Sequence, residues 1–145
     1  MTRSALLDAP APPAPVAEAF RALPSALRPR LAELRSLIFE TAEAEGVGPL
    51  TETLKWGEPA YLTEATKSGG TLRLGRLKGR DDACALFVTC TSRLADEVRA
   101  EVGGRLEVIG DRAVAIPATG PWDRAAARAA IALALTYKRR KGAAG

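Results

Sequence analysis

The sequence predicts an α+β fold, a largely antiparallel sheet with helices packed on one face. Two segments with helical periodicity open the chain. Short strand-like runs separated by turn clusters follow, and one more helical segment divides these from a second pair of strands and a last helix. The expected order is α-α-β-β-β-α-β-β-α. Short connections between successive strands favour antiparallel pairing.

The chain has the size and composition of one domain with an arm at its start. It holds 145 residues, of which 47% are apolar, enough for a full hydrophobic core. Residues 1–14 are rich in alanine and proline, a composition typical of a disordered or polyproline-like segment. We therefore expect a disordered arm over residues 1–14 and a single domain over residues 15–145.

Two helices are expected after the arm. Residues 16–24 form the first, which Pro24 ends, and residues 25–46 form the second, which ends at glycines before Pro49. Apolar positions in the second recur with the period of an amphipathic helix. Its buried face is expected to hold Leu27, Leu31, Leu34, Ile38, Thr41 and Ala42.

The middle of the chain has strand-like composition. Residues 50–57 begin this portion, and the runs 60–65, 71–78 and 83–90 follow, with turn clusters between them. In the run 71–78 the apolar alternation slips at Gly75, which predicts a β-bulge. Together these runs predict a meander of antiparallel strands.

A β-hairpin is expected around the glycine pair that follows Ser68. Ser68-Gly69-Gly70 would lie at or beside its turn, because glycine and serine favour turns. With the turn centred there, Lys67 faces Thr71 across the strands, and Glu64 or Ala65 faces Arg73. Part of the Arg73 charge would then be used in a pair with Glu64.

The C-terminal half alternates helix and strand. Residues 91–104 predict a helix, residues 105–118 a hairpin around Gly110-Asp111, and residues 120–142 the last helix. Ile131 and Leu135 lie on the side of this helix opposite its main apolar arc. Either a second layer of the same chain covers them, or they form a homodimer contact.

Charge and apolar runs bear on the class of partner. The net charge is +4, and the run "KRRK" at Lys138–Lys141 alone carries four positive charges. The basicity is therefore local, and is interpreted as a complement to the helix dipole rather than as a specific nucleic-acid surface. No apolar run approaches the ~20 residues that span a bilayer, and residues 1–16 lack the apolar centre of a signal peptide. We expect a cytoplasmic protein without membrane contact.

The cysteines and the absence of histidine limit the available chemistry. Cys84 and Cys90 are expected on one strand, ~20 Å apart, too far for a disulfide between them. The sequence has no histidine, which disfavours zinc and leaves serine or cysteine without the usual general base. We expect no cofactor, no metal site and no enzymatic activity.

Five residues form the candidate ligand site. Trp56 and Tyr61 flank Gly57 and Pro59, and are interpreted either as a bend into the sheet or as the wall of a small cleft. Near the glycine pair, Lys67, Ser68 and Arg73 supply charge and a hydroxyl suited to a small anion, or else only a soluble hairpin rim. Glu52, Glu58 and Glu64 recur every six residues but are not expected to align.

Several segments resemble the YdhG-like family, also described as domain of unknown function 1801. These are "LKWGEPAY", "KSGGTLRLG", "CALFVTC", "GDRAVAIP" and "IALALTYKRRK", within about Phe20 to Lys141, and the most specific is W-G-x-P-x-Y from Trp56 to Tyr61. The resemblance implies a sandwich of helices against an antiparallel sheet. Because one bacterial member is described as a frataxin-like iron chaperone, it also implies iron binding through acidic residues. Here Glu33, Glu40, Glu43 and Glu45 alternate with Arg28, Arg30 and Arg35, which departs from an acidic ridge.

The leading hypothesis is a non-enzymatic cytoplasmic binding module with a cleft for a small anion or other small molecule near Trp56, Tyr61, Lys67 and Arg73. One alternative is a frataxin-like iron-binding protein. Another is a homo-oligomeric interaction domain that uses Ile131 and Leu135.

Overall fold

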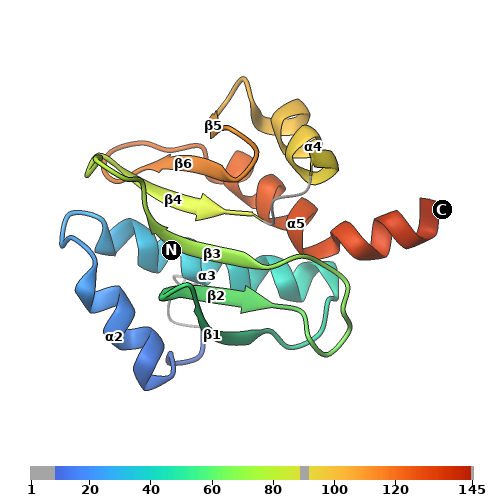
Figure 1. The fold of residues 1–145 in the computed structure, drawn as a ribbon, viewed down its shortest axis with the longest axis horizontal. Helices are drawn as coiled ribbons and strands as arrows, with labels where there is room; N and C mark the ends of the chain where they lie inside the picture. Colours follow the sequence, from blue (N-terminus) through green and yellow to red (C-terminus); the bar gives the residue numbers. More distant parts are fainter. Residues whose placement is uncertain (1–8, 89–91, 145) are drawn as a thin grey trace, which may run out of the picture.

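The computed structural model describes residues 9–88 and 92–144, and the protein has an α+β fold with a six-stranded antiparallel sheet and four helices (Figure 1). The helices are α2 (Ala14–Ala22), α3 (Arg28–Glu45), α4 (Ser92–Val102) and α5 (Arg124–Ala144). The strands are β1 (Thr51–Lys55), β2 (Glu58–Leu62), β3 (Leu72–Arg76), β4 (Ala83–Phe87), β5 (Glu107–Ile109) and β6 (Ala113–Pro117).

The strand order across the sheet is β1-β2-β3-β4-β6-β5, with every neighbouring pair antiparallel. Four strands precede α4, whereas the sequence predicted three. The extra strand is β1, which pairs along its whole length with β2 from Thr51 opposite Leu62 to Lys55 opposite Glu58. The predicted hairpin around Gly110-Asp111 is confirmed as β5 and β6.

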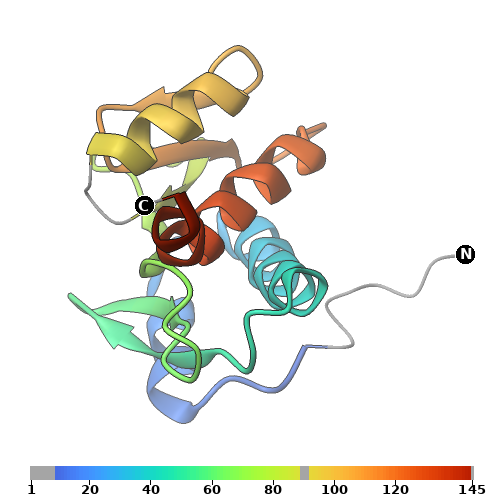
Figure 2. The same cartoon turned by 90° about the vertical axis from the view of Figure 1, so that its right-hand side faces the viewer.

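The hydrophobic core lies between one face of the sheet and α3 and α5, which lie side by side behind it (Figures 1 and 2). Alternate residues of β3, β4 and β6 face it, and the expected face of α3 is confirmed as buried. Core residues include Leu31, Leu34, Ile38, Leu72, Leu74, Leu86, Val114 and Ile116. Pro29 fits in the first turn of α3, and Gly46 ends that helix with a φ of 65°.

Ile131 and Leu135 are both fully buried in this core. The second layer of the same chain therefore covers them, which removes the exposed surface on which the homodimer contact was predicted. The reason is that α5 packs against both α3 and α4. A helix with neighbours on both sides needs apolar residues on more than one face.

The opposite face of the sheet carries small residues. Its apolar cluster consists of Leu77, Ala83, Ala85, Ala113 and Ala115, with Phe87 and Ile109 packed against it. The bulge predicted at Gly75 is absent from the β3–β4 ladder, whose register runs without interruption from Arg73 to Arg76. Gly75 instead makes room for Glu58, because a Cβ there would lie 2.5 Å from a Glu58 carboxylate oxygen.

The basic run at Lys138–Lys141 lies within α5, which continues to Ala144. Arg139 donates to the Glu45 carbonyl at 2.9 Å, and Arg140 pairs with the Glu97 carboxylate at 2.8 Å. These two side chains thus tie α5 to α3 and α4. The sequence predicted that this run complements the dipole at the end of the helix. The structure shows that two of its arginines also connect α5 to neighbouring helices.

Candidate functional site

The first pair of predicted site residues, Trp56 and Tyr61, lies in two different environments. Trp56 and Gly57 form the two-residue turn between β1 and β2, with φ angles of 55° and 76°. Two positive φ angles are typical of a type I′ turn, which favours asparagine and glycine rather than tryptophan. The Trp56 side chain is 89% exposed, whereas Tyr61 is fully buried on the core face of β2. The two rings therefore do not form one wall.

The glycine pair predicted to form a hairpin turn lies instead in a longer connection, residues 63–71, and packs under α5. Ser68 is buried, and its hydroxyl donates to the Leu135 carbonyl at 3.1 Å. Gly70 N–H donates to the Ala134 carbonyl, and Gly69 N–H to the Thr63 hydroxyl, at 2.9 and 3.0 Å. The backbone N–H groups that a phosphate needs are therefore already bonded within the chain.

The contacts between this connection and α5 also bend the helix. Arg139 N–H donates to the Ser68 carbonyl at 2.8 Å. The carbonyl of Leu135, four residues before Arg139, accepts from the Ser68 hydroxyl. Loss of regular i→i−4 pairing at one turn is a recognised cause of a helix bend, and α5 changes direction along its length (Figure 1). Lys67, with a φ of 56°, is exposed on the outside of the same loop.

Arg73 lies on the open face of the sheet, away from this loop. The β2–β3 register places it opposite Ala60, so its predicted pairing with Glu64 is wrong. It pairs with Glu58, and its guanidinium lies 4.8 Å from the centre of the Phe87 ring. Burial raises the pKa of Glu58, and the Arg73 charge offsets part of that rise. The five predicted residues thus lie at opposite ends and on opposite faces of the β-sheet.

Beside Tyr61 lies a buried charged network. The Arg35 guanidinium donates to both carboxylate oxygens of Glu52, at 2.6 and 2.8 Å, and the Tyr61 hydroxyl donates to the same carboxylate at 2.8 Å. Both charged side chains are less than a tenth exposed. Arg35 also donates to the Pro10 carbonyl and stacks 4.9 Å from the Phe39 ring. Burial, with the adjacent Glu52 charge, raises the pKa of Tyr61 well above its ordinary value.

A cavity of about 780 Å³ adjoins this network. We call it the α3 groove, because the outer side of α3 forms one wall, and residues 9–10 and 46–50 form the others. It is lined by Ala9, Pro10, Ser36, Phe39, Glu40, Ala42, Glu43, Gly46, Gly48, Pro49 and Leu50. The sequence contains no local signal for this groove, because its walls come from three separate segments.

Ser36 is the most informative residue of the groove. It is 3% exposed, and its hydroxyl has no hydrogen-bond partner among the residues described. A buried hydroxyl in a helix usually bonds to the carbonyl four residues earlier, as Thr41 does to Leu37 at 2.6 Å. Leaving such a group unpaired is costly, so an orphaned hydroxyl in a cavity wall indicates a ligand or ordered solvent.

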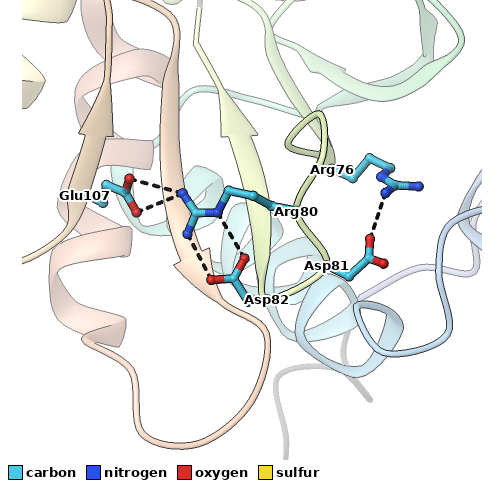
Figure 3. A network of polar contacts seen from close by, with 5 residues as sticks. All are labelled: Arg76, Arg80, Asp81, Asp82 and Glu107. Atoms are coloured by element: carbon cyan, nitrogen blue, oxygen red, sulfur yellow. Dashed lines mark hydrogen bonds and ion pairs between the residues drawn. The ribbon is translucent and has the colours of Figure 1, made fainter.

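A second, smaller cavity of about 170 Å³ lies beside β6, near the network in Figure 3. There Arg80 bridges Asp82 and Glu107, at 2.9 and 3.1 Å, while Arg76 pairs with Asp81 at 2.7 Å. Each of these charged groups is paired with an opposite charge, and most of the side chains are exposed. This cavity is therefore a weaker candidate for a ligand site than the α3 groove.

The acidic residues relevant to iron are mostly paired with arginine. Glu33 pairs with Arg30, Glu40 with Arg124 and Glu45 with Arg139, at 2.9, 3.1 and 3.7 Å. Within residues 9–88 and 92–144, no group of three or more histidine, cysteine or acidic residues is placed to hold a metal ion. Cys84 is buried, and Cys90 lies outside the residues that the structure describes.

No family model, curated protein or solved structure matches this chain. Within the described part of the chain, no helix has both the length and the apolarity to cross a membrane.

Proposed function

We propose that this chain is a binding module that holds a small organic molecule in the α3 groove. The observation that carries the proposal is the unpaired hydroxyl of Ser36, buried in the wall of a cavity of about 780 Å³. Sites for small molecules are typically ~300–1,000 Å³, mostly apolar, with a few polar groups that orient the ligand. Phe39, Ala42 and Leu50 supply the apolar surface here.

The titratable and nucleophilic side chains of this protein suit a binding role better than a catalytic one. Burial raises the pKa of the Cys84 thiol to about 11, so it is neutral at pH 7 and a poor nucleophile. The sequence has no histidine, the commonest general base. Among the described residues, the polar side chains of the α3 groove are a serine hydroxyl and two carboxylates, with no base hydrogen-bonded to the serine.

The test is a fragment screen followed by amide chemical shifts in the unmodified protein. Bound fragments should shift the amides of Ser36, Phe39, Gly46 and Gly48 more than those elsewhere. Ser36→Ala should weaken these fragments yet leave the melting temperature unchanged or higher, because it removes a buried group without a partner.

Ser25→Ala is the matched control, since Ser25 is an exposed serine just before the same helix. It should change neither binding nor melting. The proposal fails if no fragment shifts the groove amides, or if Ser36→Ala leaves the affinity of every groove-bound fragment unchanged.

A further inference from the structure

The charge of the α3 groove is negative, although the chain as a whole is basic. Among the residues that the structure describes, Glu40 and Glu43 are the charged side chains of its lining, and no lysine or arginine belongs to it. Two arginines that contact the residues around it are already engaged: Arg35 bonds to Glu52, and Arg124 pairs with Glu40. Glu43 is exposed and has no ion-pair partner among the residues that the structure describes.

The end of α3 adds to this negative potential. Glu43 lies in the last turn of the helix, and Gly46, its C-cap, also lines the groove. The C-terminal end of a helix carries a partial negative charge, which favours cations and disfavours carboxylates. The last turn of α3 contains no basic residue of its own. Arg139, from α5, bonds to Glu45 but not to Glu43.

Ser36 and Glu43 share one stripe of the helix. They are seven residues apart, two turns of an α-helix, with Phe39 and Glu40 between them. A molecule that lies along the groove therefore passes Ser36, Phe39 and the unpaired Glu43 carboxylate in turn. A metal ion is disfavoured, since the described acidic residues form no group of three around the site.

We propose that the ligand of the α3 groove is an organic cation, an alkyl- or arylalkylammonium with an apolar body. This inference rests on the proposed function, since it names the class of ligand for the same groove. The ammonium donates to the Glu43 carboxylate, and the apolar body extends along the helix toward Ser36 and packs against Phe39, Ala42 and Leu50. The bound charge also relieves the unfavourable position of Glu43 at the negative end of α3.

The experiment compares three probes of nearly equal size, benzylammonium, benzyl alcohol and benzoate, at the same pH and salt. Titrations are followed by the amide shifts of Ser36, Phe39, Gly46 and Gly48. The cation should bind about tenfold more tightly than the neutral probe, and benzoate more weakly than both. Glu43→Gln should weaken benzylammonium about three- to fivefold, and added salt should do the same.

Glu101→Gln on α4 is the matched control, because Glu101 is also exposed. It should leave the affinity of all three probes unchanged. Glu43→Gln should in addition raise the melting temperature, which separates lost binding from lost folding.

The outcomes separate the two proposals. If benzyl alcohol or benzoate binds in the groove as tightly as benzylammonium, the cation inference is overturned and the groove remains a binding site. If none of the three shifts the groove amides, and no fragment of the wider screen does, both proposals are overturned.

Discussion

Replacing one member of the buried Arg35–Glu52 pair should destabilise the protein more than replacing both. The pair joins α3 to β1, and both side chains are less than a tenth exposed. Glu52→Leu leaves the Arg35 charge buried without its carboxylate, and the Tyr61 hydroxyl loses its acceptor. Arg35→Met leaves the Glu52 charge buried, with the Tyr61 hydroxyl as its remaining side-chain donor among the described residues.

The expected magnitudes follow from these contacts. Removal of one partner of a buried ion pair costs ~3–5 kcal/mol, because the other charge stays desolvated. The double variant Arg35→Met with Glu52→Leu removes both charges and fills similar space. It still leaves the Tyr61 hydroxyl without an acceptor, a cost of ~1–3 kcal/mol. We therefore expect the double variant to be more stable than either single variant.

Equilibrium denaturation in urea measures each free energy of unfolding. The two single variants and the double variant form a thermodynamic cycle with the unmodified protein. Tyr61→Phe serves as the control for the hydroxyl alone, and should cost ~1 kcal/mol. The reasoning is refuted if a single variant costs less than ~1 kcal/mol, or if the cost of the double variant equals the sum of the two singles.

Three further predictions concern single positions. Gly69→Ala should cost several kcal/mol or prevent folding, because its Cβ would lie 2.2 Å from the Leu135 carbonyl oxygen, whereas Gly104→Ala, with open space around it, should be nearly neutral; thermal melting of both shows whether the predicted contrast holds. Trp56→Asn should raise the free energy of unfolding by about 1 kcal/mol in urea titrations, since asparagine tolerates the positive φ of this turn, and a loss of stability would mean that the exposed ring contributes to folding. Stability should fall as pH rises above ~10, by ~1.4 kcal/mol per pH unit, because the unfolded chain then loses the phenolic proton that folded Tyr61 retains; a denaturation series should show this slope flattened by Tyr61→Phe, and an unchanged slope would contradict the assignment.

Periodicity and turn chemistry were sufficient for the helices and for one hairpin. The buried face of α3 follows from apolar residues three and four positions apart, because a helix brings those positions to one side. The turn at Gly110 and Asp111 follows from local backbone preference. Both features depend on neighbours in the sequence, and so a single sequence contains the signal for them.

The connection between β2 and β3 could not be predicted in the same way. Ser68, Gly69 and Gly70 have the composition of a tight turn, but glycine is also required where two backbones approach closely. Gly69 serves this second purpose against α5, more than sixty residues further along the chain. Nothing in its local sequence distinguishes the two uses. The partner of Arg73 was likewise missed because it depends on the strand register.

The position of the candidate site could not be predicted for a related reason. The predicted site consisted of polar and aromatic residues near turns, whereas the α3 groove is formed where three separate segments meet. Ser36 stands among buried residues of α3, and a serine in that position usually bonds to its own helix. Only the arrangement of its neighbours shows that its hydroxyl is unpaired.

Lys67, Ser68 and Arg73 suggested an anionic ligand in a chain of net charge +4, but the structure assigns many arginines to internal contacts. Arg30 donates to the carbonyls of Pro117 and Gly120, Arg35 to that of Pro10, and Arg139 to that of Glu45. An arginine whose donors are used at the ends of helices and strands contributes little to recognition of a ligand, because its geometry is already committed. The charge of a site is then set by the residues that remain unpaired. Among the described residues of the α3 groove that residue is Glu43, and so a basic chain presents an acidic site.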